Sequence, residues 1–216
     1  MFIGHFGIAL GARKIAPNLS LGTLFIAAQC LDLIWPVLLL VGVESVNVEP
    51  MATVVTPLNF EYYPISHRLL MAGVWSVLLV LIYRGLVNRT FWVLCPIVLS
   101  HWVLDWITHR PDLPLVPGSD FKVGLGLWNW LTGTLLVEAI IFFLGLWIYT
   151  YCTTSRDRAG KYGLAGLVLF LIVAYLNNIF GPPPPNDPMI IGLVTLSMWL
   201  LVLWAYWVDR HRRFRN

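Results

Sequence analysis

The chain has 216 residues, of which 58% are hydrophobic and 12% are charged, and its mean hydropathy is +0.76. A soluble domain carries about 25% charged residues, so most of the surface of this chain faces something other than water. The net charge is only +3, and the basic residues stand in short segments between apolar runs, which excludes a nucleic-acid partner. The length suits a single integral membrane domain over residues 1–216.

The first apolar stretch, residues 2–15, is glycine-rich and too short to cross a bilayer, so it predicts a short interfacial or re-entrant helix. Its basic pair follows the apolar part, which is the reverse of a secretory signal. Six later segments approach the roughly 20 apolar residues that a transmembrane helix needs. In chain order they are 19–43, 68–87, 91–109, 125–151, 162–180 and 189–208. The predicted fold class is therefore all-α, a polytopic helical membrane protein with about six transmembrane helices.

The basic residues predict the orientation of these helices. Eleven of the fourteen Lys and Arg residues stand in four groups that six spans place on one side of the membrane. The groups are Arg13/Lys14, Arg84/Arg89, Arg156/Arg158/Lys161 and Arg210/Arg212/Arg213/Arg215. The positive-inside rule makes that side cytoplasmic, together with both termini. The more acidic loops 44–66 and 110–124 then face outward.

Ionisable side chains occur inside the apolar segments, where each costs several kcal/mol and usually has a function. Asp32, His101, Asp105 and Glu138 lie within predicted spans, and His67 and His109 lie at span ends. In the predicted topology all six fall in the outer half or at the midplane of the membrane. We therefore expect them to meet in one pocket that opens outward.

The spacing of His101, Asp105 and His109 is the sharpest local signal. Each four-residue step rotates a helical side chain by only about 40° and raises it by about 6 Å, so the three lie on one stripe. With metal–nitrogen bonds of roughly 2 Å, adjacent members can share an ion but the two ends cannot. A carboxylate in the middle can bridge two ions, so we predict a dinuclear site completed by Asp32 and His67, with Glu138 as a further candidate. Two such ions suit hydrolysis, because they polarise a phosphoryl or carbonyl oxygen and lower the pKa of water.

Each residue also has a simpler interpretation. A membrane histidine often hydrogen-bonds a neighbouring helix, and Asp32 is as compatible with helix pairing as with a ligand role. Glu138 is a ligand, a catalytic acid or base, or a hydrogen-bond partner of a histidine ligand. Arg68 either clamps an anionic headgroup or extends to the interface. Trp128 and Trp130 favour an interfacial aromatic belt over a substrate groove.

Four segments of the chain resemble the bacterial family of membrane-bound metal-dependent hydrolases. They are GHFGIALGARKIAP near the start, SHR at 66–68, SHWVLDWITHRPD at 100–112 and GLGLWNWLTGTLLVE at 124–138, with Asp32 between the first two. The order of their His and Asp residues is similar to that of the secreted zinc-dependent phospholipases C. The resemblance covers roughly residues 1–150, which we expect to form the core of the metal site, with residues 151–216 adding two transmembrane helices.

This resemblance implies metal-ligand roles for particular residues, and zinc as the metal, with location in the bacterial inner membrane. The implied ligands are Asp32, His67, His101, Asp105 and His109, and His5 matches the N-terminal histidine of the family. Glu138 falls where the phospholipases have a late glutamate ligand, but Thr134 stands where they have a histidine, a departure from a full three-metal site.

The sequence thus predicts a membrane hydrolase that acts on a phosphoester or ester of a lipid-borne substrate from the outer side. Asp105 and Glu138 are the expected catalytic residues, and Arg68 and Arg110 are expected to bind an anionic substrate. Mixed imidazole and carboxylate ligands suit Zn²⁺, Mn²⁺ or Fe²⁺, with two ions per chain. The alternatives are a divalent-metal transporter, which needs a path to both sides, and a membrane scaffold stabilised by a structural metal.

Overall fold

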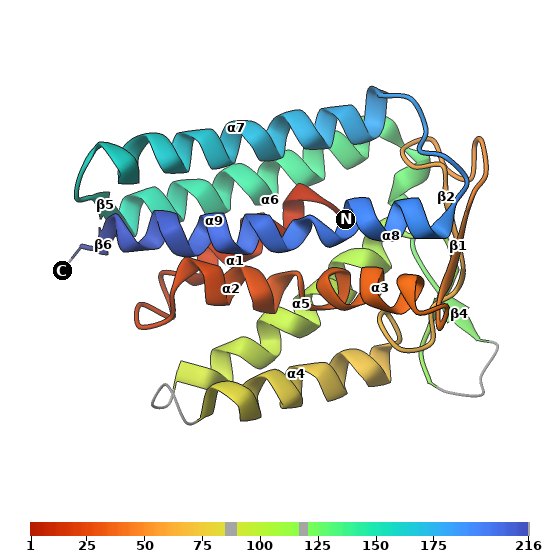
Figure 1. Cartoon of the computed structure of the whole chain (residues 1–216), viewed down its shortest axis with the longest axis horizontal. Helices are drawn as coiled ribbons and strands as arrows, with labels where there is room; N and C mark the ends of the chain where they lie inside the picture. The colour runs from red at the N-terminus through yellow and green to blue at the C-terminus, as the bar shows by residue number, and fades with distance from the viewer. Residues whose placement is uncertain (85–89, 117–120, 216) are drawn as a thin grey trace.

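The structure is a computed structural model that describes residues 1–84, 90–116 and 121–215, and about 65% of the chain is helical. The helices run along one long axis and form a bundle, with short hairpins at its two ends (Figure 1). The predicted helical fold class is confirmed in this main feature. Three two-stranded antiparallel sheets are added to it.

Three helical stretches are long and apolar enough to cross a membrane. They are α6 (Leu131–Cys152), α7 (Arg158–Phe180) and the stretch Pro188–Arg210, which comprises α8 (Pro188–Leu196) and α9 (Met198–Arg210). A fourth is formed if α2 (Leu21–Ala28) and α3 (Cys30–Leu40), which meet at a 61° bend, count as one span. The described residues therefore show three or four of the six expected spans at full length.

The two remaining predicted spans are shorter helices. They are α4 (Leu69–Arg84), with 16 residues, and α5 (Leu94–Thr108), with 15 residues, which follows a 3₁₀ turn, η1 (Thr90–Val93). At 1.5 Å per residue α5 rises about 22 Å, less than the roughly 30 Å of a bilayer core, and the described part of α4 rises about 24 Å. Residues 85–87 of the predicted span 68–87 lie outside the described residues, as does Arg89.

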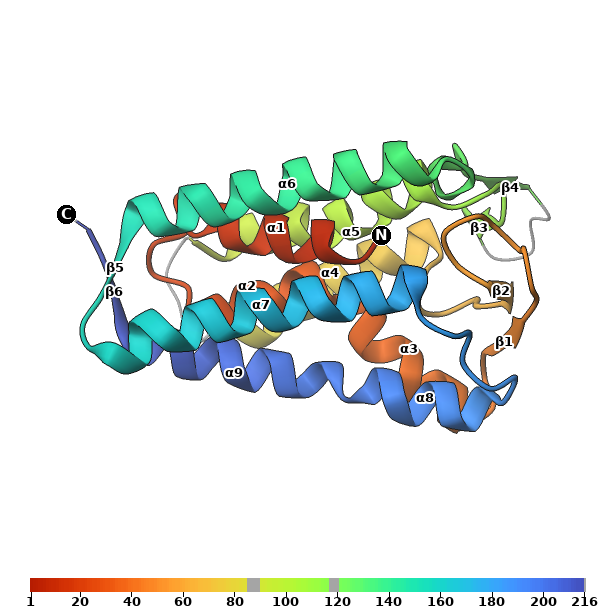
Figure 2. The same ribbon diagram turned by 90° about the horizontal axis from the view of Figure 1, so that it is seen from above.

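Two hairpins lie at one end of the bundle and the third at the other (Figures 1 and 2). β1 (Ser45–Val48) pairs with β2 (Leu58–Tyr62), and β3 (Leu113–Pro114) pairs with β4 (Lys122–Val123) just before a 3₁₀ turn, η2 (Leu127–Asn129). At the opposite end β5 (Thr153–Ser155) pairs with β6 (Arg212–Phe214). The loops predicted to be outward thus fold into hairpins over the end of the bundle away from β5 and β6.

The basic residues gather at the β5–β6 end. The Arg13 guanidinium lies 3.4 Å from the Asp209 carboxylate, and Arg156 donates its backbone N–H to the carbonyl of His211 at 2.8 Å. Arg212 donates to the Thr153 hydroxyl and stacks over a tyrosine ring. Residues of three of the four basic groups therefore lie at one end of the molecule.

The predicted short N-terminal helix is α1 (Ile3–Ala12), which is buried within the bundle against α6 (Figure 2). The contact requires glycine, because a Cβ on Gly7 would lie 2.6 Å from the carbonyl oxygen of Ile141. A Cβ on Gly145 would in turn overlap the backbone of Gly7. Small residues allow two apolar helices to approach at backbone distance. The glycines of the first segment thus bring α1, and with it His5, into the interior.

Candidate metal centre

His101 lies on α5 with its side chain fully buried, facing the break between α2 and α3. Its Nδ1 is 2.7 Å from the carbonyl oxygen of Ala28, the last residue of α2. Since a carbonyl oxygen only accepts hydrogen bonds, Nδ1 carries a proton. Nε2 then points toward the carboxylates, at 3.1 Å from Asp105 Oδ2 and 3.7 Å from Asp32 Oδ1.

His67 reaches the same point from the chain just before α4. Its Nε2 is 3.2 Å from Asp32 Oδ1 and 3.7 Å from Asp105 Oδ2. The rings of His67 and His101 lie 5.5 Å apart. Two imidazole nitrogens therefore converge on the oxygens of Asp32 and Asp105.

The orientation of the His67 ring is set by two residues on its far side. Ser66 Oγ donates to Glu44 Oε2 at 2.6 Å, so this hydroxyl accepts the Nδ1–H of His67 at 2.7 Å. Glu44 is buried, and its other oxygen accepts the backbone N–H groups of Ile65 and Ser66, each at 2.8 Å. This chain of hydrogen bonds leaves Nε2 of His67 facing the carboxylates.

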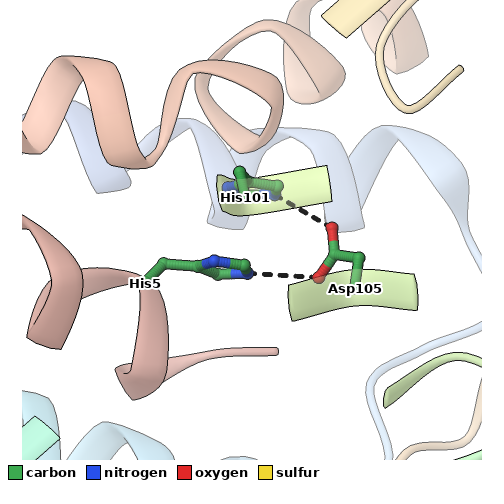
Figure 3. Close-up of side chains that lie close together, drawn as sticks. All are labelled: His5, His101 and Asp105. Atoms are coloured by element: carbon green, nitrogen blue, oxygen red, sulfur yellow. Dashed lines mark hydrogen bonds and ion pairs between the residues drawn. The ribbon is translucent and has the colours of Figure 1, made fainter. Parts of the chain in front are cut away.

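His5 enters from α1 and completes the cluster. Its Nε2 is 3.1 Å from Asp105 Oδ1, and its ring stacks on that of His101 with 3.7 Å between centroids and 3° between planes (Figure 3). Asp105 therefore points one oxygen at His5 and the other at His101, as Figure 3 shows. The Met1 amino group also lies at the cluster, 2.6 Å from Asp105 Oδ1.

The donor atoms form two groups in which all ligand atoms lie within 4.8 Å of one another: His5, His101 and Asp105, and Asp32, His67 and His101. The Met1 ammonium supplies one positive charge to Asp105 Oδ1, and the lone pairs and carboxylates that face one another on the other side of Asp105 favour a further positive charge, either a ring proton or a metal ion. Imidazole nitrogens fixed by hydrogen bonds on their far side are the usual form of metal-binding histidines. The residues present therefore fit a divalent ion, and a donor set of nitrogen and oxygen suits Zn²⁺, Mn²⁺ or Fe²⁺.

His109 lies apart from both groups. It is the C-cap residue of α5, and its Nδ1 is 2.9 Å from Asp112 Oδ1. Its ring packs against Phe60 at 5.0 Å and Trp128 at 4.4 Å. Four residues of helix place it one turn beyond Asp105. The other members of the described groups thus come from α1, from α3 and from the segment before α4, and His109 lies next to them in the wall of the cavity.

Asp112, which binds His109, is itself held by hydrogen bonds from Tyr63 and Arg110. The Tyr63 hydroxyl donates to the Asp112 carbonyl oxygen at 2.7 Å. Burial and the adjacent Asp112 carboxylate raise the pKa of the Tyr63 phenol, so it remains a donor. Arg110 donates its Nε to Asp112 Oδ2 at 3.4 Å and also bonds Asn59. The Arg110 side chain is therefore held by this loop.

Glu138 holds the start of α1. Its Oε2 accepts the backbone N–H of Phe2 at 2.8 Å and that of Gly4 at 3.1 Å, two groups that have no partner within the helix. It lines the same cavity as His109 but belongs to neither of the two described ligand groups. Arg68 follows His67 directly, and its Nε is buried without a hydrogen-bond partner among the described residues.

A cavity of about 160 Å³ adjoins the cluster and is lined by Asp32, His67, Asp105, His109, Glu138 and Trp128, among others. Its lining includes neither Arg68 nor Arg110. Trp128, which the sequence favoured as part of an aromatic belt, is a cavity wall instead, whereas Trp130 is 62% exposed.

Three supporting groups were not anticipated from the sequence: Glu44, Ser66 and the Ala28 carbonyl oxygen. Ser66 precedes His67 directly in the sequence, so its position next to a predicted ligand could have indicated a supporting role. Glu44 lies 22 residues before Ser66 and carries no local signal.

Comparisons with protein-family models, with curated proteins and with solved structures find no match to this chain. The inference of function therefore rests on the residues and their geometry.

Proposed function

We propose that this protein is a membrane-embedded metal-dependent hydrolase that acts on a phosphoester or ester of a lipid-borne substrate. The observation that carries the proposal is the convergence of His67 Nε2 and His101 Nε2 on two carboxylates, with both Nδ1 atoms engaged elsewhere. A histidine that only pairs helices has no need of this arrangement, because the second nitrogen of a neutral imidazole carries a lone pair that two carboxylates repel. The adjoining cavity gives a substrate room beside the cluster.

We propose two ions per chain, with zinc as the metal and manganese or iron as alternatives. A single nitrogen lone pair binds one ion, so His101 belongs to only one site at a time. Asp105 is suited to bridging, because its oxygens face opposite ways, Oδ1 to His5 and Oδ2 to His101 and His67. In this arrangement His5 takes the place at the second ion that the helical stripe assigned to His109.

Bound ions would supply Lewis acidity for the scissile group and lower the pKa of water. The protein holds the ligands rigid through Ala28, Ser66 and Glu44, so the donor set does not have to reorganise. Phe60 and Trp128 cover the cluster next to His109 and limit the access of water. Glu138 lines the cavity and is the proposed proton acceptor, in addition to holding α1.

We further propose that the chain crosses the bacterial inner membrane about six times, with both termini cytoplasmic and the cavity opening outward. The basic β5–β6 end and the hairpins at the opposite end support this orientation. The short helices α4 and α5 would cross where the bilayer thins locally, which costs fractions of a kcal/mol per Å of mismatch.

The test combines metal content with turnover. Purified protein is analysed for bound zinc, manganese and iron, and its release of phosphate from phosphatidic acid in mixed micelles is measured. Asp105→Asn should lose both metal and activity, with turnover lower by on the order of 10³-fold, because it removes the bridging charge. Glu61→Gln, which neutralises an exposed carboxylate on β2, is the matched control and should change neither.

Turnover that survives Asp105→Asn would refute the hydrolase proposal. Zinc flux into proteoliposomes that depends on His101, without turnover, would instead support transport. Unfolding on chelation without turnover would support a metal-stabilised scaffold.

A further inference from the structure

A second and larger cavity, of about 720 Å³, lies beside the candidate metal centre. Its walls are the end of α7, the proline-rich segment 181–185, α8 and residues 50–58 between β1 and β2. Ligand sites in proteins typically enclose about 300–1,000 Å³, so this cavity has the size of a binding site.

The two cavities adjoin each other. Five residues line both of them: Val55, Thr56, Leu58, Asn178 and Thr195. The smaller cavity extends from these residues to Asp32, His67 and Asp105. A ligand seated in the larger cavity therefore lies next to the cavity that holds the proposed metal ligands, with only the side chains of these five residues at the boundary.

The chemical character changes along this path. The part of the larger cavity formed by α8 and the end of α7 is lined by Ile179, Ile190, Ile191 and Val194, and Val194 is 64% exposed. The shared boundary carries hydroxyl and amide groups from Thr56, Thr195 and Asn178, and the far end carries the carboxylates. An apolar stretch, a polar junction and an end whose carboxylates would hold divalent cations together match an amphiphile with one anionic headgroup.

The walls are held in place by contacts independent of any ligand. Asn186, which follows the four prolines, accepts the backbone N–H of Val48 through its side chain at 2.8 Å. Gly192 of α8 faces Leu40 of α3 so closely that a Cβ there would lie 3.0 Å from the leucine side chain. The prolines lock their own φ angles. The cavity is thus pre-formed, which lowers the entropic cost of binding a flexible chain.

We propose that this larger cavity binds the hydrocarbon chain of a single-chain lipid phosphate, with the phosphate directed toward the divalent cation that Asp32 and Asp105 would hold. The proposal names the substrate class for the hydrolase function and rests on it for the reaction, although binding of the chain is measurable without turnover. One chain enters beside α8, and the polar junction accommodates the linkage between chain and phosphate.

The test uses a hexadecyl phosphate analogue that carries a photoreactive diazirine near the end of its chain. Val194→Trp fills the cavity, and Leu193→Trp is the matched control, because Leu193 is the adjacent residue of α8, is 58% exposed and lines neither cavity. In wild-type protein we expect cross-links at α8 and at residues 50–58, mapped by mass spectrometry. Val194→Trp should lower their yield about tenfold, and Leu193→Trp should leave it unchanged.

Kinetics provide the second measurement. Val194→Trp should raise KM for hexadecyl phosphate about tenfold and leave kcat and KM for the short, water-soluble butyl phosphate unchanged. Cross-links elsewhere on the protein, or equal effects of the two tryptophan variants, would overturn the proposal even where both esters are hydrolysed. Labelling that depends on Val194, without hydrolysis of either ester, would support the binding site and refute the hydrolase function.

Discussion

Replacing Ser66 by alanine tests whether His67 is held as a metal ligand. The Ser66 hydroxyl accepts the Nδ1–H of His67 at 2.7 Å and donates to Glu44 at 2.6 Å, and all three residues are buried. Ser66→Ala leaves the imidazole N–H and a carboxylate oxygen without this partner, and each unsatisfied buried group costs about 1–3 kcal/mol. The ring is then free to turn its Nε2 away from Asp32.

The expected loss in metal affinity is about 10–100-fold, the usual effect of removing a hydrogen-bond partner of a histidine ligand. This corresponds to about 1.4–2.8 kcal/mol of binding free energy. Zinc affinity is measured by competition with a chromogenic chelator, alongside thermal unfolding by circular dichroism. Ser76→Ala is the matched control, since Ser76 is a buried serine on α4 whose hydroxyl donates to the Gly73 carbonyl oxygen.

A double-mutant cycle separates positioning from a general structural effect. In a His67→Ala background, Ser66→Ala should no longer change zinc affinity, because no ring remains to be oriented. Wild-type affinity in the Ser66→Ala protein would refute the reasoning, as would an equal loss in both backgrounds.

Three further predictions concern the first helix and the ions. Gly7→Ala should lower the free energy of unfolding by about 1–3 kcal/mol, because the added methyl group meets the backbone of α6. Gly73→Ala is the control and should leave the free energy of unfolding unchanged, because a Cβ at Gly73 has nothing within 4 Å. Equal melting temperatures of the two variants would contradict the proposed packing. His5→Ala should reduce bound metal from two ions per chain to one by elemental analysis, whereas retention of two would assign the second site to other residues. Zinc at 100 times its Kd should stabilise the protein by about 2.7 kcal/mol, and an unchanged melting temperature after chelation would contradict a bound ion in the folded state.

The sequence predicted the helical membrane-protein class because composition and apolar length are local properties that do not depend on the path of the chain. The long helices α6, α7 and α8–α9 lie in the predicted segments 125–151, 162–180 and 189–208, although α6 begins only at Leu131, after the 3₁₀ turn η2, and α7 begins earlier, at Arg158. The shorter α5 could not be distinguished from a full span, because its flanking residues are apolar as well.

The sequence also indicated the residues of the cluster. Charged groups in apolar segments are costly, so Asp32, His101 and Asp105 stood out without any knowledge of their neighbours. Helical spacing placed Asp105 beside His101, which the structure shows at 3.1 Å. The same spacing grouped His109 with them, whereas in the structure His109 binds Asp112 and lies outside both ligand groups. Spacing along one helix cannot show which residues approach from other parts of the chain.

Only the tertiary structure decided which side chains meet. His5 comes to Asp105 across 100 residues because glycines let α1 lie directly on α6, and Glu44 supports His67 through a hairpin that folds back over the bundle. These contacts depend on the packing of distant segments, which no local pattern encodes. The sequence by itself determined the chemistry available within the membrane helices. The fold determined how that chemistry is assembled, because a metal centre requires donor atoms within a few ångströms and the chain supplies them from four separate segments.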